Sequence, residues 1–403
     1  MWLERFVRWR RVGKRHYRFF VLQLLWQVAF FFGASAICLS PVFADDSCVK
    51  SAQLVKKALE LGEGSEGEIE LYKEAQTLCP KMAEARFNLG LAYQKRGDLD
   101  SAEREIRESV RLKDEEAFRV GLGGIMLQKG EVSAAKEQYD KVLEKNPRSV
   151  PALQGIALIL EKQGKLQEAI ETLDRAVEVE PTNSISHFNL GVLRERLKQP
   201  DSALAAYKRA TEGDSNNFDA HYLLGTTRAR MGHYQEARQS LQRAAELKGG
   251  DVRVHLALAE VYEKLGEHSN AENALRRVIS LSPSNAIAQI NLGIVLIEER
   301  RYQEAVKVLE KASLLDGANP RLWSALGRAQ LELGNTAEAE RNLRLALERD
   351  GANPYAHNNL GVLYQRLGRS DEAREEFSSA LSLQPDLEVA RKNLESVGGS
   401  VVE

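Results

Sequence analysis

The stretch from Pro354 to Pro385, PYAHNNLGVLYQRLGRSDEAREEFSSALSLQP, contains the pattern that decides the fold. Its small residues, Gly361, Gly368, Ala373 and Ala380, recur in most earlier copies when the chain is read backwards in steps of about 34 residues. One step is shorter by a single residue, and the register still holds beyond it at Leu89-Gly90. A fixed period of this length predicts a solenoid, in which each unit buries its apolar face against its neighbours.

Each copy predicts two amphipathic helices. Apolar residues recur at helical spacing from Ala356 to Leu367 and again from Asp371 to Leu383. Gly368 lies between them, where a helix often ends in the left-handed conformation that glycine adopts freely. A glycine inside a helix, such as Gly361, costs roughly 1 kcal/mol relative to alanine. Its recurrence therefore indicates that the two helices of a unit approach closely.

These residues resemble the tetratricopeptide repeat, a helix–turn–helix unit of about 34 residues. Position 8 is Gly or Ala in nine of ten copies, and position 20 is alanine in nine of ten. The turn glycine is present in seven of ten, with Glu63, Lys198 and Arg300 as the exceptions. The resemblance implies an all-α, right-handed superhelical solenoid of about ten repeats with a C-terminal capping helix. The first repeat is degenerate, because Lys56 and Glu68 stand where small residues are expected.

The register also gives the expected boundaries. Residues 1–44 do not fit the repeat, 45–82 form the degenerate first unit, and 388–403 form a capping helix and tail. Between them we expect nine repeats over 83–387: 83–115, 116–149, 150–183, 184–217, 218–251, 252–285, 286–319, 320–353 and 354–387. The segment 388–403 is too short for an appended catalytic domain.

Residues 1–44 have the composition of a targeting segment. Seven Arg and Lys residues precede an uncharged apolar run over 19–39, and Ala44 follows as a candidate cleavage site. The run is about 21 residues long, which exceeds a usual signal core and suffices to span a bilayer. Both a cleaved signal peptide and a retained single-pass anchor therefore stay open. The basic residues are expected to stay in the cytoplasm. A signal peptide and an anchor would therefore both place the repeats on the non-cytoplasmic side, in the periplasm or tethered to the inner membrane.

The charge of the chain bears on its expected partners, and its cysteines bear on a possible disulfide. The whole chain has a net charge of −2 although residues 1–44 are strongly basic, so the repeats are acidic and nucleic acid is not an expected partner. Cys48 begins the first helix of the first repeat and Cys79 ends its second, so the antiparallel pair brings them together. We predict a disulfide between them, closing a loop of about 30 residues and contributing roughly 3 kcal/mol. Two unpaired packing cysteines are the alternative.

No catalytic constellation, phosphate-binding loop, cofactor motif or zinc-binding motif is present. Four histidines share position 4 of their repeats: His187, His221, His255 and His357. Repeats would hold these rings too far apart for shared metal ligation, so we expect them to pack between units. The chain is therefore interpreted as a non-enzymatic protein without cofactor or metal.

The resemblance implies that first helices line a concave face through positions 2, 5, 9, 12 and 13. The predicted apolar groove residues are Phe87, Val120, Phe188, Tyr222, Leu256, Ile290 and Ile294. Ile287 and Ile297 complete a four-isoleucine face on one helix. Packing against the adjacent helix is the alternative reading of these positions. At position 6, the candidates for holding a peptide backbone are Asn88, Asn189, Asn291 and Asn359, with capping or solvated roles as the alternative.

The function that these features favour is a protein–protein interaction scaffold outside the cytoplasm. It would bind an extended or helical segment of a protein partner, for assembly of an envelope, secretion or polysaccharide machine. A membrane-tethered spacer that self-associates as a homo-oligomer is the alternative.

Overall fold

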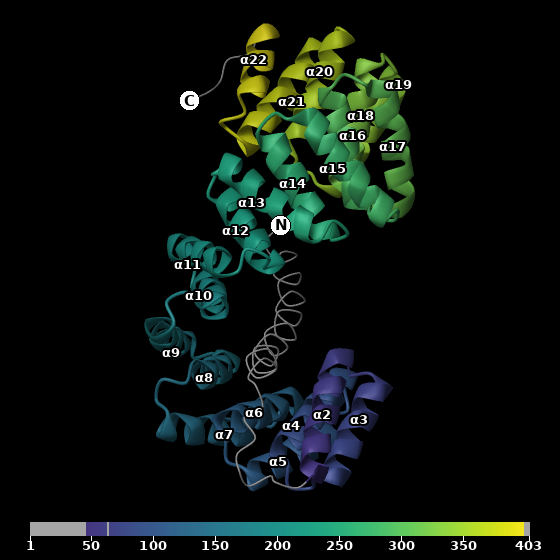
Figure 1. The fold of residues 1–403 in the computed structure, drawn as a ribbon. Coiled ribbons are helices and arrows are strands. Elements are labelled where there is room, and N and C mark those ends of the chain that lie inside the picture. Colours follow the sequence, from purple (N-terminus) through teal and green to yellow (C-terminus); the bar gives the residue numbers. More distant parts are fainter. Residues whose placement is uncertain (1–45, 63, 399–403) are drawn as a thin grey trace. The chain divides into compact units, whose positions relative to one another are not determined.

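The computed structural model describes residues 46–62 and 64–398, which divide into two compact units between Ser215 and Asn216 (Figure 1). The helices of the first unit are α2 (Asp46–Leu61), α3 (Glu66–Leu78), α4 (Ala83–Arg96), α5 (Leu99–Leu112), α6 (Glu116–Lys129), α7 (Val132–Lys145), α8 (Val150–Lys162), α9 (Leu166–Val179), α10 (Ser184–Arg196) and α11 (Pro200–Gly213). Those of the second are α12 (Phe218–Arg230), α13 (Tyr234–Leu247), α14 (Val252–Lys264), α15 (His268–Leu281), α16 (Ala286–Glu298), α17 (Tyr302–Leu315), α18 (Pro320–Glu332), α19 (Thr336–Arg349), α20 (Pro354–Arg366), α21 (Ser370–Leu383) and α22 (Glu388–Ser396).

The predicted all-α architecture is confirmed. Over the described ranges there is no strand, and helices α2 to α21 form ten consecutive pairs, each packed along its own partner. The predicted C-terminal helix is α22, which packs on α21 and buries Ala390 and Leu394, together with Leu387 at its N-cap. Within each unit, the first helices of neighbouring pairs also touch, as α16, α18 and α20 do.

The turn inside each of the nine pairs from α4 to α21 has one conformation whatever its residue. The seven turn glycines, Gly97, Gly130, Gly164, Gly232, Gly266, Gly334 and Gly368, all have φ between 70° and 86°. Lys198 and Arg300, which replace glycine in two repeats, have φ of 59° and 61°. These two residues accept a left-handed backbone that is unfavourable for residues other than glycine. The packing of the helix pair therefore determines the turn.

The recurrent glycine at position 8 makes room for the large residue at position 24 of the same repeat. A side-chain carbon added to Gly361 would lie 2.6 Å from the ring of Phe377, which is too close for any real contact. The same relation holds in six further pairs: Gly90 with Ile106, Gly123 with Tyr139, Gly191 with Tyr207, Gly225 with Leu241, Gly293 with Leu309, and Gly327 with Leu343. Each position-24 side chain is fully buried in consequence.

In the first unit, position-6 glycines extend this packing from one repeat to the next. The Tyr139 ring lies between Gly123 of its own repeat and Gly155 of the following one, where an added carbon would lie 2.4 Å from the ring. Phe87 occupies the corresponding space over Gly121, at 2.6 Å. The glycines that interrupt the predicted asparagine row therefore have a packing role of their own.

The first repeat departs from the predicted register. Lys56, expected at the close-packed position 8, is exposed, and Val55 is buried in its place. The helix thus packs one residue earlier than the repeat register predicts. Glu68, which replaces the usual alanine, is buried and accepts a hydrogen bond from the Gly64 backbone N–H at 2.7 Å.

The structure joins Cys48 and Cys79 by the predicted disulfide, with their Cα atoms 4.9 Å apart. Both cysteines belong to the apolar cluster of the first repeat, with Val55, Ile69 and Tyr72. The bond ties the start of α2 to the end of α3. It therefore stabilises the pair whose packing departs most from the repeat pattern.

Among residues 46–62 and 64–398, none of the helices combines the length and the apolar character needed to cross a membrane. The expected targeting segment 1–44, its apolar run 19–39 and the candidate cleavage site Ala44 lie outside the described residues.

Replacing Gly155 with valine should destabilise the first unit, because Tyr139 is fully buried and cannot move aside. Overpacking of this kind costs about 1–3 kcal/mol, so the urea midpoint followed by circular dichroism should fall. Gly250→Ala is the control, since an added carbon there meets nothing within 4 Å. An unchanged midpoint for Gly155→Val would contradict the packing described.

Removing the disulfide with Cys48→Ser and Cys79→Ser should loosen the first repeat by about 3–4 kcal/mol, the loss expected for a closed loop of this size. Hydrogen–deuterium exchange should then accelerate across α2 and α3, while α20 and α21 keep their protection. Equal exchange in the oxidised protein and the double variant would show that the bond does not stabilise this pair.

Candidate functional site

Most of the predicted apolar groove residues pack into the core of their own unit. Phe87, Val120, Phe188 and Ile290 are all buried. Phe87 lies against Phe118 with ring centroids 4.8 Å apart. The prediction that these four side chains line an open groove is therefore wrong. Phe87 at position 5 faces the following first helix, where it lies against Phe118 and Gly121 and is covered by the next repeat.

The other three predicted groove residues are partly buried. Tyr222, Leu256 and Ile294 pack against the main apolar cluster of the second unit. The Tyr222 ring stacks on Phe218 with centroids 6.0 Å apart, and the Arg253 guanidinium lies 5.1 Å from its centre. Burial raises the pKa of Tyr222. Tyr222 thus belongs to a packed cluster of aromatic and basic side chains.

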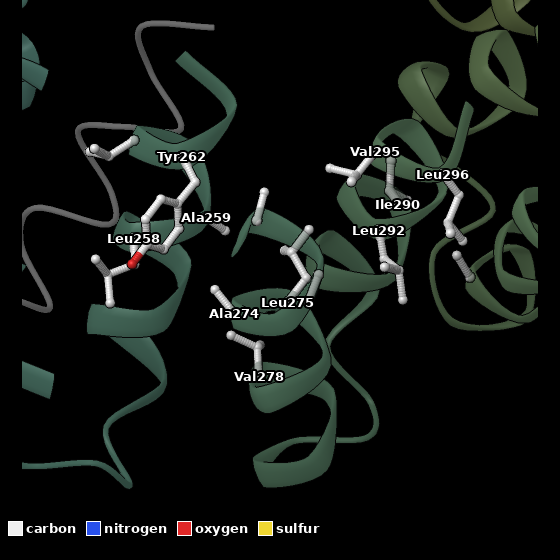
Figure 2. Close-up of a cluster of buried hydrophobic side chains, with 14 of the residues drawn as sticks. Leu258, Ala259, Tyr262, Ala274, Leu275, Val278, Ile290, Leu292, Val295 and Leu296 are labelled. Carbon is white, nitrogen blue, oxygen red and sulfur yellow. The ribbon is translucent and has the colours of Figure 1, made fainter. Parts of the chain in front are cut away.

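The four isoleucines of α16 divide between two sides of the helix. Ile290 and Ile297 are buried, each with 2% of its surface exposed, and Figure 2 shows Ile290 beside Leu292 and Val295 in the core. Ile287 is 38% exposed and Ile294 is partly exposed. Residues seven apart nearly coincide around the helix, whereas a shift of three residues rotates the side chain by about 60°. Only Ile287 and Ile294 are available to a partner.

The predicted asparagines also differ in how far they are buried. In the first unit, Asn189 is buried, its amide nitrogen lacks a hydrogen-bond partner, and Asn88 is partly exposed. In the second unit, Asn291 and Asn359 are partly exposed, and within the described ranges no hydrogen bond of their side-chain amides is found. Both project from the same helix face as the outward isoleucines, since position 6 lies one turn after position 2.

These observations define a continuous surface on the second unit, here called the first-helix surface. It comprises residues at positions 2, 6 and 9 of neighbouring first helices, which lie side by side. Its members are Ile287, Asn291 and Ile294 of α16, Arg321, Ala325 and Arg328 of α18, Tyr355, Asn359 and Val362 of α20, and Val389 of α22. Tyr355 and Val389 are 56% and 48% exposed. Positions 2 and 9 are among those that the resemblance implies for the concave face, whereas position 5, where most of the predicted groove residues lie, is not on this surface.

Ion pairs join the first helices at the C-terminal edge of this surface. Arg328 pairs with Glu298 at 2.6 Å, and Arg366 pairs with Glu332 at 2.7 Å. At the opposite edge, Arg321 is exposed and has no ion pair with any described residue. The surface therefore has one uncompensated positive charge with apolar side chains on the helices to either side.

The position-4 histidines have a structural role. A ring nitrogen of His187, His255 and His357 lies 2.9, 3.0 and 3.2 Å from the carbonyl oxygen six residues earlier. Trp323 donates its indole N–H to Gly317 in the same way, at 2.8 Å. The side chain at position 4 of these repeats thus forms a hydrogen bond with a backbone carbonyl in the turn between repeats. Across the described parts of the chain, no group of three or more His, Cys, Asp or Glu residues is arranged to hold a metal ion.

The division of α16 gives a direct test with matched substitutions. Ile287→Asp should leave the thermal midpoint of the full chain nearly unchanged, because exposed substitutions usually alter stability by no more than about 0.5 kcal/mol. Ile290→Asp should lower it strongly, because it places an unpaired charge in the core. Circular dichroism melts of the two variants distinguish these outcomes, and equal melts would contradict the assignment of the two faces.

Comparisons with known proteins agree with the repeat architecture. Tetratricopeptide repeat models match residues 83–116, 228–289, 262–329, 296–357 and 330–392, and the model "Psidin, N-terminal TPR repeats region" matches 125–248. The BBSome complex member BBS4 of Bos taurus is 29% identical over 117 residues, which are 29% of this chain and 22% of that protein.

Solved structures give similar but partial matches. MamA is 26% identical, with 40% of this chain and 95% of that chain covered and a TM-score of 0.39. Pseudomonas aeruginosa pilF is 22% identical, with 50% and 92% covered and a TM-score of 0.45. YrrB, described as a TPR protein with an unusual peptide-binding site, is 22% identical, with 55% and 96% covered and a TM-score of 0.35. With the helix pairs and their interlocking small and large residues, the matches to the repeat models show that this chain belongs to the tetratricopeptide repeat family.

Proposed function

We propose that the chain is a non-catalytic docking scaffold, and that the first-helix surface of its second unit binds a segment of a protein partner. The observation that carries this proposal is the row of outward side chains at position 2. Ile287, Tyr355 and Val389 are each more than a third exposed on first helices whose remaining apolar residues are largely buried. Exposed apolar side chains on neighbouring helices, here on both sides of Arg321, are typical of an interaction site. Asn291 and Asn359 add unpartnered amides suited to a peptide backbone.

We further propose that the scaffold works outside the cytoplasm, in assembly of an envelope, secretion or polysaccharide machine. Two features support export. The basic and apolar composition of residues 1–44 is that of a signal peptide or anchor. The Cys48–Cys79 disulfide is of a kind that persists in oxidising compartments and is rare in the cytosol. The repeats themselves are compatible with many settings, because a fold does not fix a function.

Site-specific photo-crosslinking in the native cells tests the docking surface. A benzophenone amino acid at Tyr355 should give a discrete adduct with a second protein. The same amino acid at Arg341, which is exposed on the second helix α19, should not. The absence of an adduct at position 355, or the same adducts at both positions, would contradict the proposal. An adduct of twice the mass of the chain would instead support the self-associating spacer.

A further inference from the structure

Arg321 is placed where helix stability does not favour a positive charge. It lies in the first turn of α18, next to the Asn319 cap that accepts its backbone N–H at 3.1 Å. The partial positive charge of a helix N-terminus favours acidic side chains there and disfavours basic ones. At the same repeat position, α4 has Glu84 and α12 has Asp219.

The other arginine at this position is neutralised. Arg253 of α14 donates hydrogen bonds to both carboxylate oxygens of Asp251, at 2.7–3.2 Å, and lies 3.7 Å from Asp219. Arg321 has no such partner among the described residues. Since the neighbouring Arg328 and Arg366 are paired with Glu298 and Glu332, the unneutralised charge of the surface is concentrated at Arg321.

The two flanking helices present matching groups on either side of this arginine. On α16, Ile287 and Ile294 bracket Asn291 one turn apart along the helix. On α20, Tyr355 and Val362 bracket Asn359 in the same way. Between the two asparagines, position 6 of α18 is Ala325, whose small side chain is buried. A chain crossing the three helices would thus meet an apolar pair with an amide, then Arg321, then a second apolar pair with an amide.

We infer that the first-helix surface recognises an extended protein segment in which one acidic residue lies between two apolar residues. Packed helices lie about 8–10 Å apart, and an extended chain advances about 3.3 Å per residue. The apolar residues should therefore stand about three positions before and after the acidic one. The acidic side chain pairs with Arg321, and the apolar residues contact the α16 and α20 side chains. This inference rests on the proposed docking function and adds the chemistry of the partner.

Selection of a random dodecapeptide display library on the full chain tests this inference. The recovered peptides should be enriched in Asp or Glu with Leu, Ile, Val or Phe about three positions to each side. For a recovered peptide, replacing the acidic residue with its amide should weaken binding about tenfold, as expected for loss of a charge-assisted hydrogen bond. Fluorescence anisotropy measures both affinities.

Reversing the charge of single arginines distinguishes a specific ion pair at Arg321 from non-specific electrostatic attraction. Arg321→Glu should lose the acidic peptide and bind its lysine analogue, whereas Arg341→Glu, the same charge change on an exposed residue of α19, should bind as the parent does. Recovery of no peptides, or of peptides without acidic residues, would overturn the inference, as would equal affinity for the acid and its amide. A photo-adduct at Tyr355 together with such a result would leave the docking function standing and reject only this chemistry.

Discussion

Seven of the repeats hold their two helices together by the same contact, in which a glycine of the first helix receives a large side chain of the second. The helix axes can approach only because no Cβ stands in the way, as the 2.6 Å separation between an added carbon at Gly361 and Phe377 shows. In a helix interior the glycine itself is unfavourable by roughly 1 kcal/mol. Burial of the position-24 side chain offsets this cost, since fully burying a large apolar side chain contributes about 1.5–3 kcal/mol.

This contact also decides which residues remain free for a partner. Because the two helices of a repeat interlock through positions 8 and 24, α16 presents position 5 to its neighbours and positions 2 and 9 toward solvent. Ile290 is accordingly covered while Ile287 is exposed, although the two lie less than one turn apart. Variation at position 5 mainly adjusts packing between repeats. On α16, α18 and α20, variation at positions 2 and 9 changes the surface that a partner meets.

The period of the sequence was sufficient to predict the helix pairs, their turns and the disulfide, because each follows from spacing along the chain. It was not sufficient for the groove, since an apolar residue on a helix does not reveal which neighbour will cover it. Phe87 and Phe188 are as apolar as Tyr355, yet only Tyr355 is exposed. The burial of Val55 in place of Lys56 could not be predicted for a similar reason, because packing shifted by one residue leaves the composition of the helix unchanged. The unneutralised charge of Arg321 became apparent only when the partners of Arg253, Arg328 and Arg366 were known.

Hydroxyl-radical footprinting of the unmodified full chain tests most directly which side chains of the first helix α16 are buried and which are exposed. Oxidation resolved by mass spectrometry should modify Ile287 much faster than Ile290 and Ile297, because solvent reaches only the first of these three side chains. Equal rates for the three isoleucines, or faster oxidation of Ile290 than of Ile287, would contradict the packing from which the binding surface is derived.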